Sequence, residues 1–332
     1  MTRRMHLATI AAAVSSLAVA SLSAQAPVAG AGKAPAASTT AGSPRTPWGA
    51  PDLQGLWSNA LITPLERPKA LGTKAFFTEE EARAREAKAI ADATDEARGK
   101  DAKADVAGAY NDFWWDRGTK DVGTRRTSLI VSPADGRIPW RPEVLKANQD
   151  RSATRNAMLD NPSPVSDWLQ LDTGERCITD GIPWVPYAYN NNYQIVQSPN
   201  HVVILHEQFR EMRVIPIGAK PAGNVPQWFG TSWGRWEGDT LVVETDNIAD
   251  RSRYNFANDW RQVRPSYTLV EKFTRKDGGL QYEFTVTDPT LFTSPWTAQT
   301  LMTKADGALF EYACHEGNYS MVSMLGNKQG KK

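Results

Sequence analysis

The chain has 332 residues, and its 38 lysine and arginine residues nearly balance 37 aspartate and glutamate residues. This balance, with no basic stripe, argues against a nucleic-acid partner. A chain of this length can enclose one large hydrophobic core or two smaller ones. Twelve tryptophans are unusual, and they favour stacking on a small-molecule ligand as well as core packing.

The first 26 residues have the parts of a secretory signal peptide. Arg3 and Arg4 precede an apolar run that ends near Leu22, and Ala24-Gln25-Ala26 is a small-x-small cleavage pattern. A retained membrane anchor is the alternative, but the apolar run is short and rich in alanine and serine. Cleavage leaves 36 basic and 37 acidic residues. We therefore expect a periplasmic or secreted protein with no membrane association after cleavage.

Composition and sequence pattern predict how residues 27–325 are organised. Residues 27–46 contain little to bury and predict a flexible leader. Residues 47–188 predict a region rich in helices and loops that also holds the first strands. Residues 189–325 predict an antiparallel β-barrel that belongs to the same domain.

Two helices are expected in the N-terminal region. Thr78 and Glu81 form a capping-box pattern at the start of a surface helix rich in alanine and charged residues. A weaker pattern predicts a second helix from Pro142 to about Met158. Between them, YNDFWWDRG at residues 110–118 combines acidic and aromatic side chains and could form a lid.

The C-terminal region reads as a run of short strands. YEFTVTD at residues 282–288 alternates apolar and polar side chains, and turn residues such as Ser198-Pro199-Asn200 join neighbouring strands as hairpins. Strands do not alternate with helices, which excludes a doubly wound parallel sheet. The expected strands are NYQIVQ, HVVILHE, FREMRVIPI, GDTLVVETDN, YTLVEKFT, YEFTVTD, WTAQTLMTK and ALFEYACHE.

The fold class expected is mainly β. A meander of about eight to ten antiparallel strands must protect its edges, either by closing into a barrel or by packing as a sandwich. Successive hairpins favour a lipocalin-like, calycin-type barrel. Gly55-Leu56-Trp57 resembles the Gly-x-Trp that opens such barrels, although this short motif also occurs by chance.

The two cysteines, Cys177 and Cys314, are the only ones in the chain. An even number in an oxidising compartment favours a disulfide, with two buried thiols as the alternative. Neither cysteine belongs to a C-x-x-C pair, which argues against zinc.

The pentapeptide GTSWG at residues 230–234 matches the G-x-S-x-G motif of serine hydrolases. A nucleophile elbow requires a strand before the serine and a helix after it. A loop rich in proline and glycine precedes Ser232, and strand-forming residues follow it. We therefore interpret this segment as a loop leading into a strand, whose glycines let Trp233, Arg235 and Trp236 approach the barrel mouth.

Three histidines remain after signal cleavage, and two are followed by glutamate: His206-Glu207 and His315-Glu316. A histidine beside a carboxylate suits general acid–base catalysis. We therefore expect His206, His315 and Glu316 to transfer protons, with hydrogen-bonded structural histidines as the equal alternative. The spacing matches no metal-binding motif, and no cofactor fingerprint is present, so we expect neither a metal nor a cofactor.

Several other residues are candidates for orienting a substrate. A bridge between the cysteines would bring Arg176 and His315 close together, and the three successive asparagines near residue 191 offer amide groups, or else form a turn. Arginines can bind a carboxylate or phenolate, or pair with surface acids. The substrate-binding candidates are Arg176, Asn190, Asn191, Tyr193, Trp233, Arg235 and Trp115.

Many motifs together resemble a large family of exported bacterial proteins. They include WGAPDLQGLWSN, YNDFWWDRG, ERCI, YNNNYQIVQ, RWEGDTLVVET and YACHEGNY, and they cover nearly the whole mature chain. The resemblance implies export and a single long domain, but not a reaction. Phe209-Arg210 stands where many relatives are expected to have a second histidine, which puts a paired-histidine mechanism in doubt.

These observations favour an exported enzyme that cleaves a C–O bond of a small aromatic or polyhydroxylated substrate. Carboxylates, histidines and arginines suit hydrolysis or elimination by acid–base chemistry in a tryptophan-lined barrel. The main alternative is a lipocalin-like binding protein that uses the same cavity without turnover. A structural envelope protein is a third possibility.

Overall fold

The structure is a computed structural model that describes residues 44–93, 116, 118–160, 168, 171, 173–249, 265–276, 278–316, 318–319, 321 and 325. The expected signal peptide, nearly all of the leader and residues 110–115 and 117 of the expected lid lie outside this part. Ser43–Lys332 forms one compact unit.

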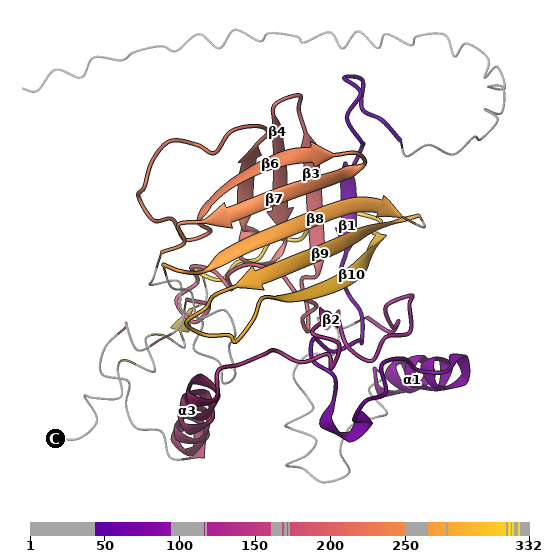
Figure 1. The fold of residues 1–332 in the computed structure, drawn as a ribbon, viewed down its shortest axis with the longest axis vertical. Helices are drawn as coiled ribbons and strands as arrows, with labels where there is room; N and C mark the ends of the chain where they lie inside the picture. Colours follow the sequence, from indigo (N-terminus) through magenta and orange to yellow (C-terminus); the bar gives the residue numbers. More distant parts are fainter. Residues whose placement is uncertain are drawn as a thin grey trace, which may run out of the picture. The chain divides into compact units, whose positions relative to one another are not determined.

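In the described part of the chain, ten antiparallel strands form one sheet. The neighbour order is β5-β4-β3-β1-β10-β9-β8-β7-β6, and β2 pairs with β10 beside this path. In Figure 1, β6–β10 cross in front of β1, β3 and β4 at a steep angle. The strands are β1 (Gly55–Ser58), β2 (Ile130–Ser132), β3 (Asn192–Gln197), β4 (His201–His206), β5 (Met212–Pro216), β6 (Thr231–Glu237), β7 (Thr240–Asp246), β8 (Thr268–Lys276), β9 (Gly279–Thr287) and β10 (Trp296–Lys304).

The sheet curls into a nearly closed, calycin-like barrel, as the sequence predicts. The short strand β1 pairs with both β3 and β10 and so joins the two hairpin runs. On the other side, the end of β5 approaches β6, where Gly218 N donates to Gly234 O at 2.8 Å. The Gly-x-Trp motif lies on β1, and Trp57 is buried under the guanidinium of Arg275.

Two details of the strand prediction are wrong. ALFEYACHE at residues 308–316 forms no strand, because β10 ends at Lys304 and the chain then leaves the sheet. Within GTSWG, Thr231–Gly234 already belong to β6 and are not a loop. Gly230 has a φ of +69°, and a Cβ there would lie 2.3 Å from Asp246 O, so the close approach of β7 requires glycine.

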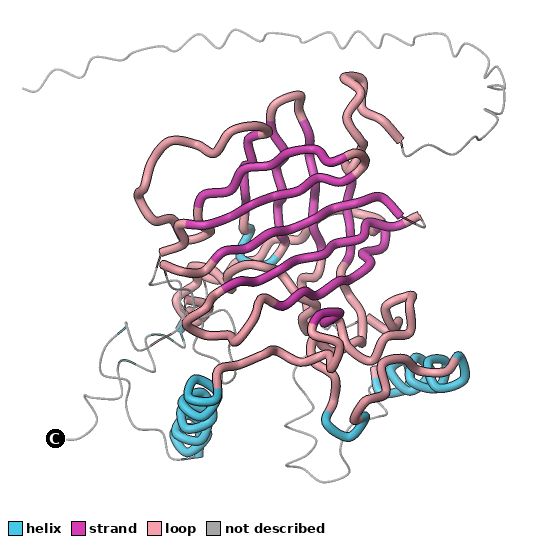
Figure 2. Tube along the Cα trace, in the orientation of Figure 1, coloured by secondary structure: helices cyan, strands magenta, loops and turns pink. Residues whose placement is uncertain are grey.

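The described α-helices lie outside the barrel (Figure 2). Helix α1 (Glu79–Asp92) begins with the expected capping box, in which Thr78 and Glu81 satisfy each other's backbone amides. Helix α3 (Pro142–Asp160) begins at the expected proline. Two short 3-10 helices, η1 (Lys69–Leu71) and η5 (Gln208–Arg210), complete the described helical elements.

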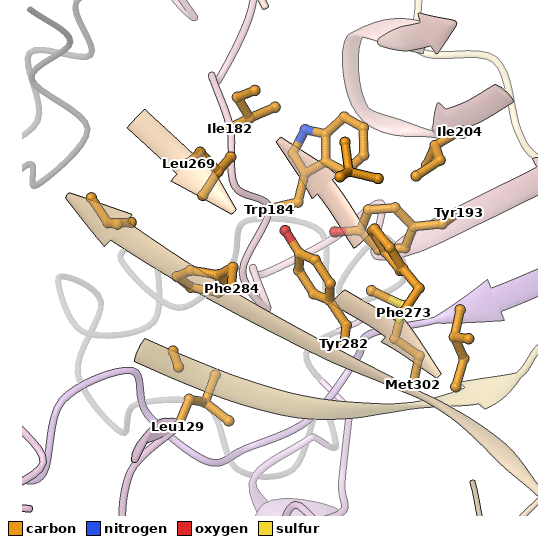
Figure 3. Packing of buried hydrophobic residues seen from close by; sticks show 14 of the residues in the cluster. Leu129, Ile182, Trp184, Tyr193, Ile204, Leu269, Phe273, Tyr282, Phe284 and Met302 are labelled. Atoms are coloured by element: carbon orange, nitrogen blue, oxygen red, sulfur yellow. The ribbon is translucent and has the colours of Figure 1, made fainter. Parts of the chain in front are cut away.

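Aromatic side chains fill the barrel interior. Trp57, Tyr193, Tyr282 and Trp296 are each at most 1% exposed. Figure 3 shows the hydroxyl groups of Tyr193 and Tyr282 pointing to the same region beneath Trp184. Several tryptophans therefore serve the core, which was the more ordinary of the two roles expected for them.

Candidate functional site

Glu211 lies between the end of β4 and the start of β5, and its buried carboxylate accepts hydrogen bonds from a loop earlier in the chain. Thr179 Oγ1 donates to it at 2.5 Å, the backbone amide of Asp180 at 2.8 Å, and Trp184 Nε1 at 2.5 Å. A buried carboxylate requires such donors, because its desolvation is otherwise unfavourable. Glu211 thus fixes residues 179–184 against the barrel.

His206, the last residue of β4, lies beside Glu211. Its imidazole stacks on Tyr193 with 4.5 Å between ring centroids and packs on Trp184 at 4.9 Å. Its Nδ1 is 3.6 Å from Glu211 Oε2, and this buried nitrogen has no hydrogen bond within the described part of the chain. We call Trp184, Tyr193, His206 and Glu211 the barrel-end cluster.

A buried ion pair lies deeper in the barrel. Arg213 forms two hydrogen bonds to Glu271, at 3.0 and 2.6 Å, and both side chains are almost fully buried. The hydroxyl of Tyr282 donates to Glu271 at 2.8 Å. Burial, followed by the negative charge of Glu271, raises the pKa of Tyr282 well above its ordinary value. Arg213 also donates to Ser232 and Thr245, which gives the GTSWG serine a structural partner.

An open cavity of about 490 Å³ lies between two irregular segments. The first wall, residues 61–65, follows β1, and the second wall, residues 185–188, follows the loop that Glu211 holds. We call this cavity the wall pocket. It is lined by Leu61, Ile62, Thr63, Pro64, Leu65, Leu129, Val185, Pro186, Tyr187 and Ala188.

Hydrogen bonds hold the first wall. Pro64 O accepts the amide of Leu129 at 2.8 Å. Thr63 Oγ1 donates to the buried carboxylate of Asp121 at 3.1 Å, and Arg85 on α1 reaches the same carboxylate. Irregular backbone is therefore fixed here by specific polar contacts and not by a strand ladder.

Asn191 holds the second wall. Its side chain accepts the amide of Tyr187 at 2.8 Å and donates to Tyr187 O at 2.9 Å and to Asp116 O at 2.6 Å. The amide of Asp116 in turn donates to Ala188 O at 2.8 Å. Asn191 thus forms hydrogen bonds within the protein, and these bonds fix the backbone of Asp116 to the second wall, although Asp116 is not one of the lining residues.

The Asp116 carboxyl is the titratable group most relevant to chemistry beside the pocket. Burial raises its pKa above the ordinary value, and the negative charge of Glu207 raises it further, while hydrogen bonds from Asn191 oppose the shift. Glu207 is buried, and its two oxygens accept from Asn192 Nδ2 and from the amide of Phe310, both at 2.8 Å. A half-buried acid with a raised pKa suits proton donation.

The disulfide expected between Cys177 and Cys314 is present, with 5.7 Å between the two Cα atoms. The C-terminal segment that leads to it passes residues 207–210. Phe209 packs on Tyr312 with ring centroids 4.7 Å apart, and Arg210 pairs with Glu311. The Phe209-Arg210 pair therefore contacts the C-terminal segment.

The three expected catalytic residues are not brought together. His206 is buried in the barrel-end cluster, whereas His315 and Glu316 are exposed beyond the disulfide, and no contact joins them to His206 among the described residues. Arg176 lies next to Cys177, with its guanidinium 5.4 Å from the ring of Trp168.

The remaining substrate-binding candidates are scattered. Asn190 is half-buried with a φ of +56°, as the alternative turn interpretation predicts, and Tyr193 is in the core. Trp115 lies outside the described residues.

Trp233 and Arg235 lie on the outer face of β6. The inner face carries Gly234, whose nearest neighbours are core side chains. Lys220 lies over the Trp233 ring at 4.9 Å, and Arg235 pairs with Glu237 and Glu244. The expectation that they approach the barrel mouth is therefore wrong, because strand alternation turns both side chains away from the interior.

Sequence reasoning missed the wall pocket and the roles of Glu211 and Asn191. Asp116 was included only as part of an expected lid. No group of three metal-ligating side chains occurs among the described residues, and none of their helices is long and apolar enough to cross a membrane. No protein-family model matches the chain, and no curated protein matches it in sequence.

Proposed function

We propose that the protein is an exported enzyme that cleaves a C–O bond of a small aromatic or polyhydroxylated substrate in the wall pocket. Asp116 is the general acid. The observation that carries this proposal is the half-buried Asp116 carboxyl, with its raised pKa, tied by backbone hydrogen bonds to a wall of a cavity of about 490 Å³.

The chemistry requires a proton at the leaving oxygen. Protonated Asp116 donates it as the C–O bond breaks and the bonding electron pair moves to that oxygen. In a hydrolysis, water adds its hydroxyl to the carbon, and its remaining proton restores the acid. In an elimination, the neighbouring carbon instead loses a proton to the Asp116 carboxylate, which restores the acid, and the C–H bonding pair forms the double bond. Glu207 acts on Asp116 through its negative charge.

The test is a screen of the mature protein against aryl ethers and aryl glycosides, with products identified by mass spectrometry. Asp116→Asn should lower kcat by about 100-fold or more, the usual contribution of a general acid. Asp239→Asn is the matched control, because this carboxylate is exposed and pairs with Arg45. If Asp116→Asn turns over a substrate as fast as the wild type, the proposed role is wrong.

The roles expected for His206 and His315 are tested in the same assay. His206→Ala disturbs the barrel-end cluster beside the second wall, whereas His315→Ala changes an exposed residue. We expect a loss of activity for the first variant. A comparable loss for the second would restore the sequence-based hypothesis that His315 and Glu316 transfer protons.

A lipocalin-like binding protein is the second candidate, and the largely apolar lining of the wall pocket favours it. It predicts ligands that raise the melting temperature but are recovered chemically unchanged. Any product that depends on Asp116 would rule it out.

Export is proposed from the N-terminal sequence, and the disulfide is consistent with an oxidising compartment. The intact mass of protein from a periplasmic fraction should correspond to cleavage after Ala26. A full-length mass would contradict this assignment.

A further inference from the structure

The outer face of β3–β5 is aliphatic. Strand alternation places Val196, Val203 and Val214 on this face, because the residues beside them on each strand are buried in the core. Val196 is 48% exposed, Val214 53% and Met212 57%. We call this surface the aliphatic face. It consists of Val196, Val203, Leu205, Met212, Val214 and Pro216.

The strand register gathers these side chains into one patch. Val203 on the middle strand pairs with Val196 on one side and with Val214 on the other. Leu205, two positions further along β4, pairs with Met212. Residues directly opposite each other on one face of a sheet have Cβ atoms about 4.5–5.5 Å apart. The aliphatic face is therefore continuous across three strands.

The outer face of β8 and β9 follows the opposite pattern. Lys272 and Glu283 are paired there across the two strands, with 3.6 Å between nitrogen and oxygen. A sheet face exposed to water is expected to be polar in this way. The other outward residues near this ion pair are Val270, Thr274, Gln281 and Thr285. The same barrel thus has a polar outer face and an aliphatic one, and solvation alone explains only the first.

The lack of charge on the aliphatic face indicates what kind of partner fits it. Arg213 is the only lysine, arginine, aspartate or glutamate in the described strands β3–β5, and it is buried. A protein partner steered by charge would require complementary charges, and a lipid surface favours lysine, arginine and aromatic side chains. An uncharged sheet face is instead complementary to itself, as a two-fold homodimer requires.

Net charge does not oppose contact between two copies. After signal cleavage the chain has 36 basic and 37 acidic residues, so two copies repel each other little. Homodimer interfaces are also the more apolar class of protein interface. Both properties favour a second copy of this chain as the occupant of the aliphatic face.

The size of the aliphatic face fits a weak dimer. Its half-exposed and partly exposed side chains form a patch of the order of 300–600 Å², which is the largest size typical of a monomer and is often functional. Two such patches would bury about 600–1,200 Å², at the low end of specific interfaces. The exposed Gln194 and His201 on the same face add a polar rim.

We propose that the protein forms a weak two-fold symmetric dimer in which the aliphatic faces of two copies pack together. The two sheets lie face to face about 10 Å apart, as in a β-sandwich. Val203, on the middle strand, lies near the two-fold axis, and burial of the aliphatic side chains drives association. The dimer contact is separate from the proposed enzyme activity, which concerns the wall pocket.

Sedimentation equilibrium of the mature protein tests this dimer at concentrations from about 5 µM to about 1 mM, the range suited to a weak complex. The average mass should rise from that of one chain to that of two. Sulfate should strengthen the dimer, because it favours burial of apolar surface. Sodium chloride should not weaken it, because no ion pair contributes. A monomer mass across the whole range would overturn the inference.

Two lysine variants locate the contact. Val214→Lys places a charge on the aliphatic face and should weaken dimerisation at least about ten-fold, because the charge would be buried without a partner. Val270→Lys makes the same change on the polar outer face of β8 and should leave the dissociation constant unchanged. Circular dichroism confirms that both variants are folded. An unchanged dissociation constant in folded Val214→Lys, or an equal loss in Val270→Lys, would refute the proposal.

A spin label gives an independent measurement. Both native cysteines are bridged, so Val203→Cys provides one reactive thiol in each chain. Two sheets about 10 Å apart place the two labels within about 20 Å, so dipolar broadening should appear as the dimer forms. Labelled Val270→Cys should show none. Stronger broadening at Val270 than at Val203 would place the contact on another face and contradict the proposal.

A lipid surface is the competing occupant. Vesicles of phosphatidylcholine are mixed with the protein and sedimented. The dimer proposal expects the protein to remain in the supernatant, with its aliphatic face covered by a second copy. If a monomeric protein sediments with the vesicles and Val214→Lys releases it, the aliphatic face binds lipid and the dimer proposal is wrong.

Discussion

The barrel and the walls of the pocket beside it are stabilised in different ways. In the barrel, strand ladders satisfy the backbone, and a continuous core buries side chains such as Trp296 and Tyr282. The walls are irregular segments held by single side chains: Asn191 bonds to the second wall, and Glu211 holds the loop that leads into it. A defect in the barrel should therefore affect the whole fold, whereas a defect in a wall should first affect the site.

Substitutions in the walls and in the barrel strands should differ in their effect on packing. A strand residue is constrained on both sides by its neighbours in the ladder, so changes there disturb packing. A wall residue such as Ala188 lines the cavity without belonging to the core cluster, so a change in its side chain should affect the core less.

The largest effect on stability is expected at the disulfide, which ties the loop before the second wall to the end of the chain. The Cys177–Cys314 bridge spans 137 residues, so replacing both cysteines by alanine should lower the free energy of unfolding by about 5 kcal/mol in the chain-entropy model. Urea denaturation measures this change. A loss below about 1 kcal/mol would mean that the unfolded chain is little constrained by the bridge.

The second-largest loss in the free energy of unfolding is expected inside the barrel. Arg213→Met removes one partner of a buried ion pair and leaves Glu271 without its counter-charge, which should cost about 3–5 kcal/mol. The whole urea transition should shift with an unchanged slope. Replacing both partners by methionine should cost less than the single change. Equal losses would show that packing and not the unpaired charge dominates.

A smaller and more local effect is expected at the junction between barrel and wall. Glu211→Gln keeps the side-chain size but removes the charge that Thr179, Asp180 and Trp184 share, at a cost of about 2 kcal/mol. Hydrogen exchange should accelerate in residues 179–184 while the β8–β9 ladder stays protected. Uniform acceleration would contradict the separation of barrel and wall.

The difference between the barrel and the walls also explains which parts of the structure could be predicted from the sequence. The barrel was predictable because alternation in segments such as YEFTVTD reports burial on one strand face, and turn residues mark the hairpins. The capping box of α1 was equally local. The C-terminal ALFEYACHE alternates too, but it forms no strand because β10 already pairs with both β9 and β1.

The site was less predictable because its residues are remote in sequence. Glu211 contacts Thr179 across 32 positions and Trp184 across 27, and no local pattern encodes such contacts. His-Glu pairs attracted attention as neighbours in sequence, yet the relevant partner of His206 is Glu211 and not Glu207. The disulfide was an exception, because two cysteines allow only one pairing.

The smallest change in stability is expected at Asp116, and the direction of its pKa shift determines whether stability rises or falls with pH. Its folded-state pKa is raised above the ordinary value of 3.8, so the folded protein binds this proton more tightly than the unfolded chain. Stability is therefore lost as the pH rises from 3.8 through the folded-state pKa. Asp116→Asn removes this loss, so its melting temperature should slightly exceed that of the wild type at pH 7.

The advantage should vanish as the pH falls below 3.8, where Asp116 is protonated in both states. Scanning calorimetry between pH 3 and 8 measures it, and Asp92→Asn at the exposed end of α1 corrects for the loss of one negative charge. A variant that is more stable at neutral pH but less active would show that Asp116 is kept for the site at the expense of the fold. A melting temperature below that of the wild type at pH 7 would instead make Asp116 a structural anchor of the second wall.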